Sequence, residues 1–303
     1  MPCDFPLRAY RSATERGPSG KPLLTFNGLK SIQSTHAMEI PCNNCMGCKL
    51  EKARQWSVRM MHESKFWPQN SFITLTYDDQ NVPQDFGLDL RHLQLFFKRL
   101  RKRLDQRIRF FACGEYGDEN GRPHYHAVVF NYDPPDKLKH SVNEHGDINY
   151  SSEALSGLWT HGFATTADVT HASCSYVARY VTKKIKSGDR FGAERYYRLS
   201  PVDGAFHSVR PEFAVMSRRP GIGDEYVKQF KSDFYPSGFI VVNGVKQAPP
   251  KYYLSKLTEE ERHTLQLKNI ARNATRRPEK TMERRLAKAA VRDNRIKNLK
   301  RKL

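Results

Sequence analysis

The chain has 303 residues, with 51 Lys or Arg against 32 Asp or Glu and a formal net charge of +19. No apolar run is long enough to span a membrane, and no signal-peptide pattern opens the chain. A charge this large indicates the kind of binding partner rather than the fold, and the expected partner is a polyanion, nucleic acid. No long amphipathic helix with an aromatic face favours a membrane surface instead. We therefore expect a cytosolic protein with one large or two small domains.

Six cysteines in such a chain do not indicate a disulfide framework. Cys42, Cys45 and Cys48 repeat at a spacing of three, which is close to a zinc knuckle. A closed structural zinc site takes four ligands, so Cys3 is a candidate fourth. The alternative is a set of reduced thiols in a turn before a helix.

The first half of the chain alternates between helix and strand patterns. Residues 1–40 are polar, and we expect them to be irregular. After the cysteines, apolar residues at helical spacing predict a helix that ends before Pro68, and a strand is predicted over 71–77. Asp89 is a good N-cap for the next helix. Lys and Arg crowd that helix between 98 and 103, either as a solvated face or as DNA contacts.

Residues 109–116 and 124–130 predict a β-hairpin, because both are rich in strand-forming residues and a turn of Gly, Asp, Asn and Pro separates them. Strand side chains alternate between faces. His124 and His126 therefore share a face, which Glu115 can join from the paired strand. Two imidazoles and a carboxylate suit a divalent metal with open positions for substrate oxygen. The alternative is a pair of solvated histidines.

A helix is predicted over 172–186 after a short helix and a strand. Tyr176 and Tyr180 stand at i and i+4, roughly 5–6 Å apart at Cβ, with Lys183 and Lys184 following. The alternative is that both tyrosines are packing residues of an amphipathic helix. A free tyrosine has a pKa of about 10, so only about one in a thousand is phenolate at pH 7. A metal ion and neighbouring cations would help such a nucleophile. Phosphodiester transesterification by tyrosine is a function that would use the two phenols, the lysines and the metal site together.

The order of elements predicts an α+β fold, an antiparallel sheet with helices on one face.

Beyond residue 190, Asn243-Gly244 predicts a hairpin turn and Thr258 with Glu261 a capping box. From Lys256 onward there are 16 Lys or Arg against 6 Asp or Glu. This tail adds salt-sensitive affinity for DNA or merely solubilises the chain. We expect four segments. Residues 1–66 form a Cys-containing N-terminal segment and residues 67–190 a core. Residues 191–255 form an accessory extension and residues 256–303 a basic helical or disordered tail.

The His-x-His strand and the Tyr-x-x-x-Tyr helix with its lysine resemble the HUH superfamily of rolling-circle replication initiators. The closer resemblance is to the replication initiation proteins of microvirus-type, gokushovirus-like phages with single-stranded DNA. Three further stretches carry it: Phe-Ile-Thr-Leu-Thr-Tyr-Asp-Asp at 72–79, Pro-Cys-Asn-Asn-Cys-Met-Gly-Cys at 41–48 and Met-Ser-Arg-Arg-Pro-Gly-Ile-Gly at 216–223. The likeness spans roughly residues 40–225.

This resemblance implies a ferredoxin-like or RRM-like core and a metal-dependent DNA nickase that also rejoins strands. One tyrosine would form a 5′-phosphotyrosine and free a 3′-OH primer, and the second would cut the regenerated origin. The implied metal is Mg²⁺ or Mn²⁺, and the implied partners are origin DNA and a host helicase and polymerase in the bacterial cytoplasm. The residues so implied are Glu115, His124 and His126 for metal, Tyr176, Tyr180, Lys183 and Lys184 for catalysis, and Arg179, Arg218 and Arg219 for DNA.

Three other interpretations stay open at this point. A histidine-triad nucleotide hydrolase would need a third histidine where Val128 stands. A relaxase or transposase of the HUH class would share the chemistry but act on other DNA. A non-catalytic single-strand DNA-binding protein would use the charge and aromatics without cutting. Tyr176 with Arg179 and Tyr180 with Lys183 both fit Tyr-x-x-Arg/Lys, so the sequence leaves the order of attack open.

Overall fold

The computed structural model describes residues 3–18, 20–32, 36–117, 120–143, 146–180, 196–275 and 281–298. Its contacts divide the chain into two compact units. We call Lys52–Ile270 the sheet unit, and Met1–Glu51 with Ala271–Arg301 the cysteine unit.

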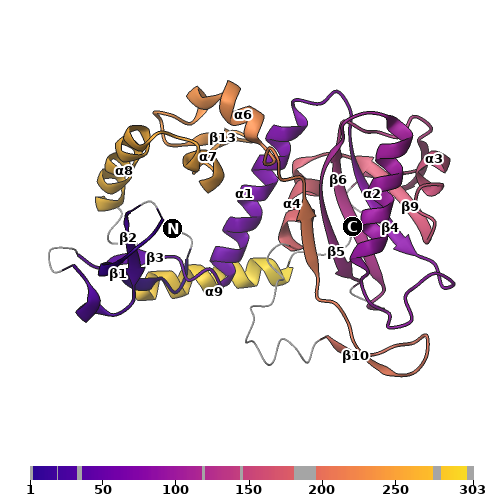
Figure 1. Cartoon of the computed structure of the whole chain (residues 1–303), viewed down its shortest axis with the longest axis horizontal. Helices are drawn as coiled ribbons and strands as arrows, with labels where there is room; N and C mark the ends of the chain where they lie inside the picture. The colour runs from indigo at the N-terminus through magenta and orange to yellow at the C-terminus, as the bar shows by residue number, and fades with distance from the viewer. Residues whose placement is uncertain are drawn as a thin grey trace. The chain divides into compact units, whose positions relative to one another are not determined.

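The sheet unit is built on a seven-stranded antiparallel sheet in the order β12-β5-β6-β4-β9-β8-β7 (Figure 1). Its strands are β4 (Asn70–Tyr77), β5 (Arg109–Tyr116), β6 (Pro123–Phe130), β7 (Leu138–Val142), β8 (Ile148–Ser151), β9 (Gly162–Asp168) and β12 (Phe213–Met216). Every pairing is antiparallel, so the predicted α+β class is confirmed. The predicted hairpin is the β5–β6 pair.

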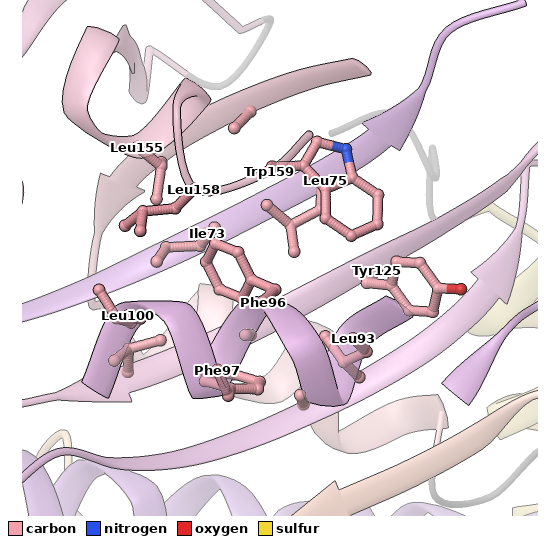
Figure 2. Close-up of a cluster of buried hydrophobic side chains, with 14 of the residues drawn as sticks. Ile73, Leu75, Leu93, Phe96, Phe97, Leu100, Tyr125, Leu155, Leu158 and Trp159 are labelled. Carbon is pink, nitrogen blue, oxygen red and sulfur yellow. The ribbon is translucent and has the colours of Figure 1, made fainter. Parts of the chain in front are cut away.

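One face of the sheet is covered by α2 (Leu90–Leu104) and α3 (Glu153–Ser156). Figure 2 shows the apolar side chains of α2 interleaved with those of the strands above it. Ile73 and Leu75 of β4 meet Phe96 of α2 there, all fully buried. Burying each such side chain contributes roughly 1.5–3 kcal/mol. Asp89 caps α2 as predicted, accepting from Arg91 N–H at 2.7 Å.

The opposite face is covered by α1 (Met46–Ser64) and α4 (His171–Tyr180). Met60 and Val177 pack there on Phe72 and Phe111. Helices thus lie on both faces, where one covered face was expected. The physical reason is that the central strands carry apolar side chains on both sides: in β5, Phe110 and Ala112 belong to one core cluster, and Phe111 and Cys113 to the other. Strands of that kind need cover on each face.

A buried ion pair ties α1 to the strand that carries the candidate site. Arg109 Nε at the start of β5 donates to Glu63 Oε1 of α1 at 2.6 Å, with both side chains 4–5% exposed. The other Glu63 oxygen accepts the Gly223 N–H at 2.7 Å, and Arg109 also donates to the Pro220 carbonyl at 2.8 Å. Gly223 has a φ of +76° and abuts the Tyr253 hydroxyl, so a side chain here would be strained and crowded. Residues 216–223 therefore bind both to α1, through Glu63, and to β5, through Arg109.

The remaining elements of the sheet unit are short, except for α8. They are β10 (Tyr197–Leu199), β11 (Phe206–Ser208), α6 (Asp224–Gln229), the 3-10 helix η2 (Lys231–Asp233), β13 (Ile240–Val242), β14 (Val245–Gln247), α7 (Lys251–Ser255) and most of α8 (Glu259–Ala274). The predicted Asn243-Gly244 turn joins β13 to β14. The predicted capping box forms, since Thr258 N–H donates to Glu261 and Glu261 N–H to Thr258 Oγ1.

The cysteine unit contains a small sheet in the order β2-β1-β3 and the basic helix α9 (Met282–Asn298). Its other elements are β1 (Leu7–Arg16), β2 (Pro22–Thr25), β3 (Met38–Ile40) and the 3-10 helix η1 (Gly28–Lys30). The expectation that residues 1–40 are irregular is wrong. The buried positions of β1 are the small residues Ala9 and Ser12, so no apolar alternation marks this strand. No helix in the described part of either unit is long and apolar enough to cross a membrane.

Candidate active site

The site is set by the register of the β5–β6 hairpin. Glu115 lies directly opposite His124, and Cys113 opposite His126. Because paired residues point to the same side of a sheet and alternate residues share a face, Glu115, His124 and His126 are brought to one face. This is the face that α1 and α4 cover.

The two imidazoles converge on one carboxylate oxygen. His124 Nε2 lies 2.7 Å and His126 Nε2 3.0 Å from Glu115 Oε1. Ligand atoms of the three residues all lie within 4.8 Å of one another. Glu115 and His126 are buried, and His124 is partly so.

Hydrogen bonds behind the imidazoles show that this group fits a cation. His124 Nδ1 lies 3.0 Å from the Arg122 carbonyl, which only accepts, so that nitrogen carries the proton. In the neutral imidazole, the Nε2 lone pair then faces an anionic oxygen, an arrangement that requires a proton or a metal between them. His126 Nδ1 contacts Thr74 Oγ1 at 2.9 Å. Among the described residues, Glu115 Oε2 is buried and has no hydrogen-bond partner.

The surroundings shift the acid–base behaviour of each group. Burial would raise the pKa of Glu115, but hydrogen bonds from His124 and His126 and their charge hold that pKa at about 2. Burial lowers the pKa of His126 despite its bond to Glu115. Glu115 is therefore ionised over the pH range in which imidazole and carboxylate bind metals.

Both predicted tyrosines lie on α4 and reach this group in series. The Tyr176 hydroxyl donates to Glu115 Oε1 at 2.7 Å, and the Tyr180 hydroxyl donates to the Tyr176 oxygen at 3.0 Å. Thr170 caps the helix, its Oγ1 accepting from Ser173 N–H. Burial and the Glu115 charge raise the pKa of Tyr176 far above its ordinary value. The phenol is thus held protonated until something neutralises Glu115.

The other predicted site residues are distributed around this centre. Arg179 is exposed on α4, with its guanidinium 5.5 Å from the Tyr176 ring centroid. Arg218 and Arg219 are exposed in the loop after β12. Lys183 and Lys184 lie outside the described residues.

The four cysteines Cys3, Cys42, Cys45 and Cys48 come together in the other unit.

Sequence reasoning missed two residues that position the site. Thr74 contacts His126, and its place on that face follows from strand alternation in β4. Arg122 accepts from His124 through its carbonyl while its side chain donates to the Tyr77 carbonyl and pairs with Asp79. An arginine in a turn carries no such signal in the sequence.

Comparison with known proteins places these residues in a family. A sequence model described as "Replication-associated protein ORF2/G2P" matches residues 70–185, which hold all of β4, β5, β6 and α4. The chain is 32% identical over 262 residues to Replication-associated protein VP4 of Bdellovibrio phage phiMH2K, covering 84% of this chain and 76% of that one.

Two further relatives show the same degree of similarity. Replication-associated protein ORF2 of Spiroplasma virus 4 is 33% identical, with 73% of this chain and 68% of that one covered. Replication-associated protein ORF4 of Chlamydia phage 1 is 30% identical, with 73% of this chain and 55% of that one covered. No solved structure matches the chain.

Proposed function

Because the chain belongs to the family of replication-associated proteins of microvirus-type phages, we propose that it initiates rolling-circle replication as a metal-dependent DNA nickase. It would cut single-stranded origin DNA by tyrosine transesterification, as HUH endonucleases do, and later rejoin the strand. The observation that carries the proposal is the meeting of the Tyr176 hydroxyl with Glu115 Oε1, the oxygen on which His124 and His126 converge.

Glu115, His124 and His126 would hold the metal. Hard Mg²⁺ prefers oxygen ligands, and the two imidazoles also suit Mn²⁺. When bound, such an ion polarises a non-bridging phosphate oxygen and positions the scissile bond. The unsatisfied Glu115 Oε2 and the Nε2 atoms of the histidines are the groups available to it.

Tyr176 is the proposed nucleophile of the first cut, because its hydroxyl lies at Glu115 while that of Tyr180 lies behind it. Its oxygen bonds to phosphorus, and the bond from phosphorus to the 3′ oxygen breaks. The phenolic proton leaves along the hydrogen bond to Glu115 and is passed on to the leaving 3′ oxygen, which becomes the primer hydroxyl. The product is a 5′-phosphotyrosine.

Tyr180 would perform the second cut after a new origin has been copied. A strand's 3′-hydroxyl then attacks the phosphotyrosine, breaks the bond between phosphorus and Tyr176, and closes the circle. The hydrogen bond between the two hydroxyls supports this alternation, because it offers a path for a proton from one phenol to the other. Lys183 and Lys184 are proposed to hold neighbouring phosphate oxygens.

The charge of the molecule supports a DNA partner. Arg179, Arg218 and Arg219 are exposed cations suited to phosphate contacts. A host helicase and polymerase are the further proposed partners. A relaxase or transposase would share the chemistry, but the matched relatives are phage replication proteins. A non-catalytic DNA-binding protein would leave the convergence of phenol, carboxylate and imidazoles without a role.

The test is a denaturing gel of the full chain with labelled single-stranded phage DNA that contains the origin, with Mg²⁺, with Mn²⁺, or with chelator. We expect a metal-dependent, protease-sensitive covalent adduct. Tyr176→Phe should reduce its rate of formation by roughly 1000-fold or more, since the nucleophile is lost. Tyr180→Phe should keep the first adduct and lose strand rejoining.

The matched control is Tyr197→Phe, which removes the hydroxyl of an exposed tyrosine. It should react like the unchanged chain. A normal adduct in the Tyr176→Phe, Tyr180→Phe double variant would overturn the tyrosine assignment. DNA binding without an adduct, with either metal, would favour the non-catalytic interpretation.

A further inference from the structure

Four thiols outside the candidate active site gather at one point of the cysteine unit. The sulfur atoms of Cys3, Cys42, Cys45 and Cys48 all lie within 4.8 Å of one another, and those of Cys3 and Cys45 are 3.9 Å apart. A tetrahedral zinc–thiolate centre with bonds of about 2.3 Å places its sulfurs roughly 3.8 Å apart. None of the four forms a disulfide. The arrangement is that of a closed four-sulfur site.

Backbone amides point at these sulfurs. Cys45 N–H and Asn44 N–H donate to Cys42 Sγ at 3.3 and 3.5 Å. Asp4 N–H donates to Cys45 Sγ, and Cys42 N–H to Cys3 Sγ, both at 3.3 Å. The turn that aims them needs Asn43 in the left-handed region, with a φ of 59°. Amide donors of this kind stabilise thiolate and orient metal ligands.

The cysteine unit has almost no hydrophobic core to hold these loops otherwise. Among its described residues, Cys3 and Ala9 are the only apolar side chains that are buried. Large apolar side chains such as Phe26 and Leu29 are 63% and 97% exposed. Small units that cannot bury enough apolar surface are usually held by disulfides or a structural metal. If the four cysteines were only reduced thiols, the cysteine unit would have neither a disulfide nor a structural metal.

We infer that Cys3, Cys42, Cys45 and Cys48 bind one structural Zn²⁺ ion, which fixes the cysteine unit in place of a hydrophobic core. Four protein ligands leave no open position, so this centre is not catalytic. The same loop holds α9: Asp4 accepts the Gly47 N–H at 3.2 Å and pairs with Arg292 of α9 at 2.6 Å. Zinc therefore orders the end of the chain as well as its beginning. Neither inference depends on the nicking chemistry.

The test is elemental analysis and cobalt substitution of the full chain, purified under reducing conditions. We expect about one zinc per chain. Replacement by Co²⁺ should give the intense thiolate-to-cobalt charge-transfer band and the visible bands of a tetrahedral centre. Cys45→Ser should lose both the zinc and the band.

Two variants serve as matched controls. Cys174→Ala removes a buried cysteine outside the cluster and should keep the zinc. The double variant His124→Ala, His126→Ala should keep the charge-transfer band, because imidazoles do not produce it. In case Cys45→Ser does not fold, chelation of the unchanged chain gives a second measurement: proteolysis should speed up at least tenfold within residues 3–45 and much less within Lys52–Ile270.

Three results would overturn the inference. The first is full-length protein that holds no zinc and gives no cobalt–thiolate band. The second is zinc that Cys45→Ser retains but the double histidine variant loses. The third is bound iron with a visible absorption of its own, which would assign the cluster to a different metal. Loss of the zinc with an intact covalent DNA adduct would leave the proposed nicking function standing.

Discussion

Glu115 concentrates the chemistry of the candidate site on a single oxygen. Its Oε1 lies within hydrogen-bond distance of two imidazoles and one phenol, all within 3.0 Å. The carboxylate keeps a pKa of about 2, whereas its charge helps raise that of Tyr176. A cation bound here would lower the pKa of Tyr176 again, because it would offset the negative charge of Glu115. In the proposed mechanism, metal binding and activation of the phenol would thus be one electrostatic event.

At the residue scale, we predict that Thr74→Val weakens Mn²⁺ binding by about 10–100-fold, the usual cost of losing a group that orients a ligand. Valine has the shape of threonine but cannot contact His126 Nδ1, which Thr74 Oγ1 approaches to 2.9 Å. Titration followed by electron paramagnetic resonance measures the affinity. Thr74→Ser restores the hydroxyl and should restore binding. Equal affinity in the valine variant would contradict this role for Thr74.

At the scale of elements, α1 is the structural support behind the site. It carries Glu63, which binds Arg109 of β5, and His62, whose ring stacks on Tyr226 at 3.6 Å between centroids. His62 Nδ1 lies 2.9 Å from the Tyr253 hydroxyl. Burial, with the nearby Lys65 charge, lowers the pKa of His62 from 6.5 to about 4. The helix therefore contains a neutral histidine that resists protonation.

This histidine predicts acid sensitivity with a defined sign. Between about pH 6.5 and 4, the unfolded chain binds a proton that the folded chain does not, so stability present above 6.5 is lost on acidification. The loss reaches up to about 3 kcal/mol near pH 4. Urea unfolding of the chain across this range measures it. His62→Phe should flatten this part of the pH dependence, whereas His263→Gln, which changes an exposed histidine of α8, should not.

At the scale of the whole molecule, charge is unevenly distributed along the chain. About half of the net charge of +19 lies beyond residue 256, where α8 and α9 expose most of their surface. The proposed cutting, by contrast, depends on residues between 74 and 184. Binding strength and cutting are therefore expected to respond to different substitutions.

We predict that Arg272→Gln with Arg295→Gln, one exposed arginine from each of these helices, weakens DNA binding without slowing the cut. Each lost phosphate contact should reduce the slope of log K against log salt by about 0.7 on single-stranded DNA. A fluorescence-anisotropy salt titration gives the slope. Adduct formation at saturating DNA should stay unchanged. An unaltered slope would show that these helices do not contact DNA.

Local patterns were enough to predict the hairpin with Glu115, His124 and His126, because strand alternation fixes which side chains share a face. Tyr176 and Tyr180 followed from helical spacing in the same way. The cover on both sheet faces could not be predicted, since an amphipathic helix does not reveal which face it will meet. The β7–β8 extension was missed because every β7 side chain is exposed, so no apolar alternation marks that strand. The Glu63–Arg109 pair was missed because it joins distant segments.

The place of β12 in the sheet has a consequence for the nascent chain. β5 can pair with β6 once both are synthesised, but the partner of its other edge, Phe213–Met216, is synthesised far later. Until then, β5 presents unpaired amides and carbonyls that invite pairing with another chain. A ribosome-bound or truncated chain ending near residue 190 would contain Glu115, His124 and His126, the proposed metal ligands, yet expose this edge. It would also lack the Gly223 partner of Glu63. The shortest fragment that can keep the site soluble and in register should therefore extend past Gly223.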